Sequence, residues 1–146
     1  MLTDEIRRNW ESDITGHAQL IPSLAISEYP AWTVKLVDGY GVAIPYSGAQ
    51  EINENFANAR IYSSIIRFNA ETEQKALLLT TESYDIAVPF SALCAELVDP
   101  GINGAFRNEI IKSPVNWWRE WKELLGNKNI DDRVYDVLGE LCVLDY

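Results

Sequence analysis

The chain has 146 residues, of which 47% are hydrophobic, so it is long enough to bury one core and is not of the disordered class. Its net charge of −10 excludes a surface that binds nucleic acid on every side, because phosphate binding requires clustered Lys and Arg side chains. No apolar run approaches the length of a membrane helix, and the acidic start at residues 1–5 is unlike a secretory leader, so we expect a cytoplasmic protein.

Apolar residues at helical spacing predict a first helix that runs from Leu2 to about Ser12 and faces the core through Trp10. Residues 30–37 and 40–45 then read as two strands of a hairpin, joined at an Asp-Gly turn. This is the clearest hairpin in the sequence.

The middle of the chain predicts further strands. The polar stretch 47–58 is expected to form a surface loop or a short helix, and residues 60–68 and 76–81 a second strand pair. Residues 84–89 are predicted to form a short strand, after which the pattern changes to helical period over 90–97.

Pro-Gly and Asn-Gly pairs at 100–101 and 103–104 are interpreted as breaks in regular structure. Ser113 and Pro114 then predict the start of a helix with an apolar, tryptophan-rich stripe, and Gly126 its end. Because adjacent helical residues point in different directions, one of Trp117 and Trp118 is expected to be partly exposed. Together these elements predict an α+β fold, a small antiparallel sheet flanked by an N-terminal helix and C-terminal helices.

The two cysteines, Cys94 and Cys142, have no metal-ligand spacing and lie in apolar surroundings, which favours buried free thiols. His17 is the only histidine, so a histidine-based metal cluster is excluded. The sequence predicts no metal-ligating residues in this chain.

The charge is unevenly distributed. Residues 1–104 carry 6 basic and 14 acidic residues, a net charge of −8, whereas residues 105–146 carry 6 and 8, a net charge of −2. A nucleic-acid or partner contact is therefore predicted in the C-terminal third, through Arg107, Lys112, Arg119, Lys122 and Trp118. A solvated helix face of alternating charges is the alternative interpretation.

Two Glu-x-Lys sequences occur, a pattern that some metal-dependent nucleases place on a strand after an upstream Asp. Glu73-Gln74-Lys75 is predicted to lie in a connection between strands, and Glu120-Trp121-Lys122 on a helix. The first lacks a suitable upstream Asp, and a helix cannot place Glu and Lys of the second as a strand does. Both are therefore interpreted as chance matches.

The last stretch, 131–146, predicts an amphipathic helix with an acidic flank formed by Asp136 and Glu140. No Gly, Pro or basic last turn follows Leu144, which is typical of a helix that has been cut short. We expect a boundary between 1–126 and the helix that begins after it.

The order of these segments resembles the N-terminal half of the PD-(D/E)XK motif proteins, nucleases of bacterial restriction and phage-defence neighbourhoods. The similarity is carried by the helix at 90–97, the tryptophan-rich helix at 117–125 and, most sharply, the Gly-Glu-Leu sequence at 139–141. It implies that 1–126 is an accessory domain and that 127–146 is the first helix of a truncated nuclease core. It also implies that Glu140 helps to order a Mg²⁺ or lysine site, whose Asp-Phe and Glu-Val-Lys partners are absent from this sequence.

The resemblance thus predicts an accessory or recognition portion of a Mg²⁺-dependent nuclease, non-catalytic by itself, that positions DNA or a defence partner. The main alternative is a stand-alone protein-interaction module that docks through the tryptophan-rich helix or a sheet edge. A third hypothesis, an acidic mimic of DNA, requires the carboxylates of 1–104 to line one face.

Overall fold

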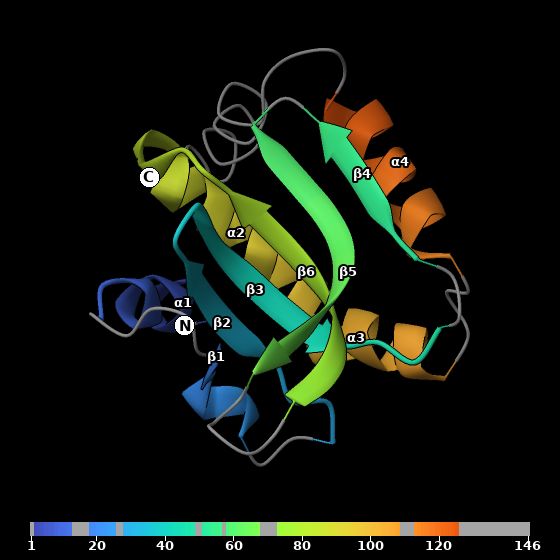
Figure 1. The fold of residues 1–146 in the computed structure, drawn as a ribbon, viewed down its shortest axis with the longest axis horizontal. Coiled ribbons are helices and arrows are strands. Elements are labelled where there is room, and N and C mark those ends of the chain that lie inside the picture. The colour runs from blue at the N-terminus through green and yellow to red at the C-terminus, as the bar shows by residue number, and fades with distance from the viewer. Residues whose placement is uncertain are drawn as a thin grey trace, which may run out of the picture.

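The computed structural model describes the chain over residues 2–12, 18–25, 28–48, 51–56, 58–67, 73–108 and 113–125. Its centre is a six-stranded antiparallel sheet with the strand order β1-β2-β3-β6-β5-β4 (Figure 1). The strands are β1 Ala18–Leu20, β2 Trp32–Leu36, β3 Gly39–Pro45, β4 Asn53–Phe56, β5 Ala59–Arg67 and β6 Glu73–Thr81. The predicted α+β class, with an antiparallel sheet and helices at both ends of the chain, is confirmed.

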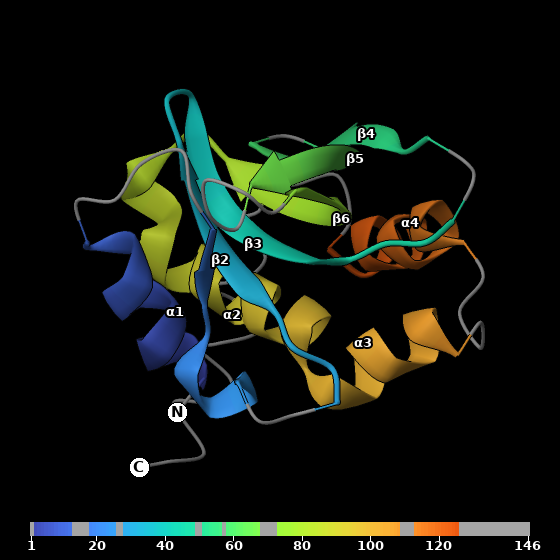
Figure 2. The same ribbon diagram turned by 60° about the horizontal axis from the view of Figure 1, so that its bottom comes forward.

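The helices lie on one face of this sheet (Figure 2). They are α1 Leu2–Trp10, α2 Ala87–Val98, α3 Pro100–Arg107 and α4 Pro114–Leu125, with short 3-10 turns η1 Pro22–Leu24 and η2 Tyr84–Ile86. Among the described residues no helix is both long and apolar enough to cross a membrane.

The predicted hairpin is β2 and β3, in which Leu36 pairs with Gly39 around a two-residue loop. The predicted second pair is β5 and β6, and β6 inserts between β3 and β5. Side chains alternate across these strands, so neighbouring residues serve different clusters. Val42 and Leu79 face the helices and Ala43 and Leu78 the opposite side.

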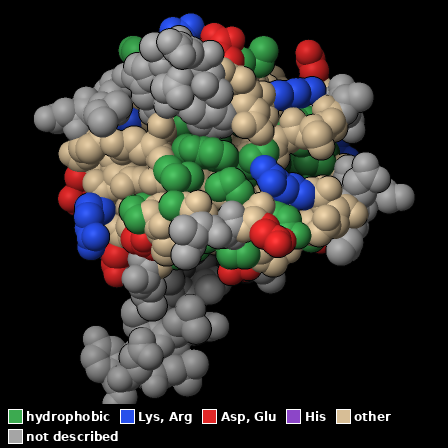
Figure 3. Space-filling model, turned by 90° about the horizontal axis from the view of Figure 1, so that it is seen from below, with side chains coloured by type: hydrophobic (Ala, Val, Ile, Leu, Met, Phe, Trp, Pro, Cys, Tyr) green, Lys and Arg blue, Asp and Glu red, His purple; other side chains and the backbone are tan. Residues whose placement is uncertain are grey.

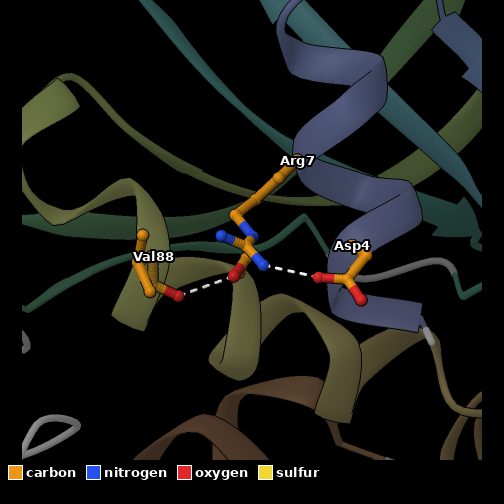
Figure 4. A network of polar contacts seen from close by, with 4 residues as sticks. Asp4, Arg7 and Val88 are labelled. Atoms are coloured by element: carbon orange, nitrogen blue, oxygen red, sulfur yellow. Dashed lines mark hydrogen bonds and ion pairs between the residues drawn. The ribbon is translucent and has the colours of Figure 1, made fainter.

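The larger cluster lies between the sheet and the helices. Trp10 of α1 is 6% exposed, which confirms that it faces the core, and its ring stacks on Phe90 of α2 with centroids 5.8 Å apart. The rim of the α1–α2 contact is polar. Figure 4 shows the 2.6 Å ion pair between Arg7 and Asp4 of α1 and, on α2, the carbonyl oxygen of Val88, which accepts a 2.6 Å hydrogen bond from the Ser91 hydroxyl.

Three predicted elements were wrong. Residues 53–56, predicted as part of a loop or short helix, form the edge strand β4, because their backbone pairs with β5. Two hydrogen bonds between Ile52 and Ser63 extend this pairing past the start of β4. Residues 84–89 are helical, since Pro89 lies in the first turn of α2, where a missing N–H costs no hydrogen bond.

The third wrong prediction concerned the breaks at 100–101 and 103–104, which lie inside α3. Asp99 caps this helix, because its carboxylate accepts a 2.9 Å hydrogen bond from the N–H of Gly101, and Pro100 occupies the first helical position. Asn103 is fully buried, and its amide donates to the carbonyl oxygens of Tyr29 and Pro30 at 3.1 and 3.2 Å. Of the residues that suggested breaks, Pro100 therefore opens the helix and Asn103 anchors it to the 29–30 segment.

Candidate functional site

Two hollows lie at opposite ends of the sheet. The first, which we call the basic hollow, has a volume of about 340 Å³ and is lined by Pro45, Tyr46, Ser47, Gln74, Lys75 and Arg107. The second, the polar hollow, has a volume of about 460 Å³. It is lined by Leu36, Asp38, Gly39, Asn55, Asn58, Ala59, Arg60, Tyr62, Thr80, Thr81, Glu82 and Ser83.

The basic hollow forms where β3 ends, β6 begins and α3 ends. The N–H of Tyr46 donates to the carbonyl oxygen of Lys75 at 3.2 Å, which continues the β3–β6 ladder by one residue. This bond brings the side chains that follow β3 next to the first residues of β6. Arg107 reaches the same place from the last residue of α3.

Each cation of the basic hollow is held by a neutral group. The Lys75 ammonium donates to the carbonyl oxygen of Gly48 at 2.8 Å and lies 5.2 Å from the centre of the Tyr46 ring. The Arg107 guanidinium donates to the carbonyl oxygen of Glu28 at 3.2 Å. Among the described residues, no Asp or Glu lines the hollow and neither cation forms an ion pair. The described lining of the hollow therefore carries a positive charge, in a chain whose net charge is −10.

Figure 3 views the end of the molecule where β6 begins and α3 lies. Lys and Arg side chains stand there beside hydrophobic ones, and Asp and Glu side chains also reach this face. The positive charge is thus local, and a ligand with spaced negative charges fits it better than a broad anionic surface does.

The structure brings one of the predicted contact residues, Arg107, to a hollow. Arg119 is on α4, where it forms a 3.2 Å ion pair with Glu54 of β4, so a phosphate would have to displace a carboxylate there. Lys112 and Glu140 lie outside the described residues, as does the side chain of Lys122.

The expectation that one of Trp117 and Trp118 is partly exposed was wrong. Trp118 is 0% and Trp117 is 7% exposed, because α4 packs between the sheet and α3 and buries two adjacent positions. The Trp117 ring meets Phe106 of α3 edge to face at 5.9 Å. A direct partner or nucleic-acid contact by Trp118 is therefore not available in this structure.

The Glu-x-Lys sequence at 73–75 opens β6. The prediction that it lies in a connection between strands was therefore wrong. Its Glu73 forms a 3.1 Å ion pair with Arg67 of β5, and Lys75 belongs to the basic hollow. In the described part of the chain no group of three or more His, Cys, Asp or Glu residues could hold a metal ion. Glu73 and Lys75 thus each contact a different partner, Arg67 and the carbonyl oxygen of Gly48.

The sequence interpretation did not single out Lys75 as a candidate contact residue, because it weighed this lysine only within the Glu-x-Lys pattern. Ala76 pairs with Pro45, thirty-one positions earlier, and only this register brings Lys75 beside Tyr46 and Ser47. Comparisons with protein-family models, curated proteins and solved structures found no match.

Proposed function

We propose that this chain is a DNA-contacting accessory domain of a Mg²⁺-dependent nuclease of the PD-(D/E)XK type, non-catalytic by itself. The segment order and the Gly-Glu-Leu sequence at 139–141 support the family assignment. The basic hollow is the observation that carries the DNA contact, because its described lining presents two cations and no carboxylate.

The chemistry of the hollow suits a phosphodiester backbone. Lys75 supplies an ammonium and Arg107 a guanidinium, and both groups bind phosphate oxygens by charge-assisted hydrogen bonds. Ser47 and Gln74 add neutral side chains that commonly contact phosphate or sugar. Such contacts position a duplex and carry no sequence information, which is the role expected of an accessory domain.

Binding of a labelled duplex, followed by fluorescence anisotropy over a range of salt concentrations, tests the DNA contact. We expect Lys75→Gln and Arg107→Gln each to weaken binding several-fold for all sequences and to lower the salt slope by about 1. Arg67→Gln is the matched control, because Arg67 is exposed, pairs with Glu73 and does not line the hollow. Equal losses in all three variants, or affinity that does not respond to salt, would contradict the proposal.

A digest of duplex DNA with Mg²⁺ tests the non-catalytic part of the proposal. We expect no cleavage, because Glu73 has an arginine partner and no second described carboxylate forms a metal site with it. The complete nuclease is expected to require Mg²⁺ and to draw on Glu140. Robust cutting that Glu73→Ala abolishes would overturn the assignment of this chain as non-catalytic.

The alternative function, a protein-interaction module, has to use a surface other than the tryptophans of α4, since Trp117 and Trp118 are buried. A sheet edge is the other surface predicted for docking. The edge strand β1 has three residues, of which Leu20 is 41% exposed. Light scattering of the purified chain distinguishes the two functions. Self-association lost on Leu20→Lys, together with DNA binding that is absent at low salt, would favour the interaction module.

A further inference from the structure

The polar hollow lies at the end of the sheet opposite the basic hollow, where five strands begin or end together. Gly39 opens β3 after the turn that contains Asp38, and β6 ends at Thr81, which pairs with Ala59 at the start of β5. The volume of about 460 Å³ is within the range of small-molecule sites. Its lining is dominated by groups that form hydrogen bonds, so it fits a polar ligand.

One wall of the polar hollow is a guanidinium held in a fixed position. The Nε–H of Arg60 donates to Asn53 Oδ1 at 2.9 Å, and the central carbon of the guanidinium lies 4.0 Å from the centre of the Tyr62 ring. Arg60 forms no ion pair with any described carboxylate. Two neutral contacts therefore orient this cation, and no described carboxylate forms an ion pair with it.

The other wall carries carboxylates. Asp38 and Glu82 are exposed at the rim, and neither forms an ion pair among the described residues. Thr80 of β6 pairs with both Arg60 of β5 and Gly41 of β3, so it lies between the two walls. Because neighbouring strands are about 4.8 Å apart, β5 and β3 are separated by roughly 10 Å across β6.

We propose that the polar hollow binds a nucleobase and prefers guanine. The O6 and N7 atoms of guanine form a pair of acceptors that a guanidinium such as Arg60 contacts with two hydrogen bonds. On the adjoining edge of the base, the N1 and N2 atoms of guanine carry N–H groups that donate to a carboxylate such as Asp38 or Glu82. The amide of Asn55 or Asn58 supplies further hydrogen bonds to either edge.

The two walls discriminate against the other bases. Adenine places an amino group beside its N7, and that group opposes a guanidinium, which can only donate. Cytosine carries its amino group and its acceptors along one edge, so it cannot engage the guanidinium on one wall and a carboxylate on the other at once. Uracil lacks the amino group. Guanine therefore fits both walls better than any of these three.

This site does not depend on the basic hollow, and calorimetry with the four ribonucleoside monophosphates tests it separately. The four share one phosphate, so a contact through Lys75 and Arg107 alone would give equal affinities, which would overturn the proposal. We expect guanosine monophosphate to bind about tenfold more tightly than the others. Absence of saturable binding of guanosine monophosphate would overturn it too.

Variants of the two walls provide the second half of the test. We expect Arg60→Gln and Glu82→Gln each to weaken binding of guanosine monophosphate about tenfold and to reduce the preference over adenosine monophosphate. Arg67→Gln, on the same strand but outside the hollow, is expected to change neither. Arg60→Lys keeps the charge but not the paired donors, so it is expected to behave as Arg60→Gln does. Undiminished guanine preference in Arg60→Gln, with an unchanged circular dichroism spectrum, would overturn the assignment.

Discussion

The indole N–H of Trp10 donates a 2.8 Å hydrogen bond to the carbonyl oxygen of Gly41, and this bond joins α1 to the middle of β3 across 31 positions. Trp10 is buried, so its partner oxygen depends on a protein donor at this place. We expect Trp10→Phe to lower the free energy of unfolding by about 2–4 kcal/mol, through the lost hydrogen bond and the smaller ring. Urea denaturation measures this, with Tyr84→Phe, an exposed aromatic, as a control that stays near zero.

The partner of Trp10, Gly41, cannot accept a larger residue. A Cβ atom at this position would lie 1.8 Å from the carbonyl oxygen of Leu79 and 2.8 Å from the Cα atom of Thr80, both of them backbone atoms of β6. We expect Gly41→Ala to be among the most destabilising single changes, at about 3 kcal/mol or more. Gly101→Ala is the matched control, because a Cβ there would meet only the Asp99 carboxylate. Similar stabilities of the two variants would show that β3 and β6 are not this close.

The sequence predicted those elements whose signals are local. The β2–β3 hairpin follows from alternation around a turn, and the start of α4 from Ser113 and Pro114. It missed β4 and α3 for a physical reason in each case. The strand β4 lies at the edge of the sheet, with no partner strand on its outer edge, and such strands are often polar. The helix α3 begins with residues that break a helix interior but suit the first turn.

The candidate sites were harder to predict than the fold. Arg107 was predicted as a contact residue because it lies in the less acidic third of the chain, whereas Lys75 comes from the acidic part. The polar hollow combines residues from 36 to 83, and only the register of β3, β6 and β5 brings them together. Composition and spacing do not show how strands that are not consecutive in the chain, such as β3 and β6, pair with each other.

The stability of the fold is predicted to depend on the side-chain N–H groups of Asn103. It is fully buried, and its amide N–H groups face the carbonyl oxygens of Tyr29 and Pro30. We expect Asn103→Asp to destabilise the fold by about 3 kcal/mol or more at neutral pH, because a buried carboxylate would face two acceptors. Asn116→Asp is the control, since Asn116 is exposed in the first turn of α4, where an acid is favourable. Thermal unfolding of both variants measures the difference.

Two buried acidic groups predict that stability falls at alkaline pH. Burial raises the pKa of the Cys94 thiol well above its usual value, and burial, followed by the nearby Cys94, Tyr84 and Asp85, raises the pKa of Tyr40. Both groups are neutral when protonated, so the unfolded chain loses these protons first. Their stabilising effect is therefore complete below the unfolded pKa values, about 8.5 for Cys and about 10 for Tyr, and is lost above them.

Denaturation series at several pH values test this effect. We expect the free energy of unfolding to decline above about pH 8.5, by up to about 1.4 kcal/mol per pH unit for each group that titrates. Cys94→Ala is expected to be less stable at neutral pH but to show a shallower decline between about pH 8.5 and 10. An equally steep decline in Cys94→Ala would exclude a contribution from this thiol.

The contact between Arg60 and Tyr62 predicts two pKa shifts of opposite sign. Burial raises the pKa of Tyr62, the Arg60 guanidinium and a hydrogen bond with Thr80 oppose this rise, and Asp38 adds to it. We therefore expect Arg60→Gln to raise the pKa of Tyr62 further and Asp38→Asn to lower it. The ring-carbon NMR signals of labelled tyrosine, followed through an alkaline titration, measure both shifts, and Arg67→Gln should cause none. Because Arg60 and Asp38 lie on different walls of the polar hollow, shifts in both directions would show that one phenol senses both walls. A Tyr62 pKa that moves with neither variant would mean that these charges do not converge there.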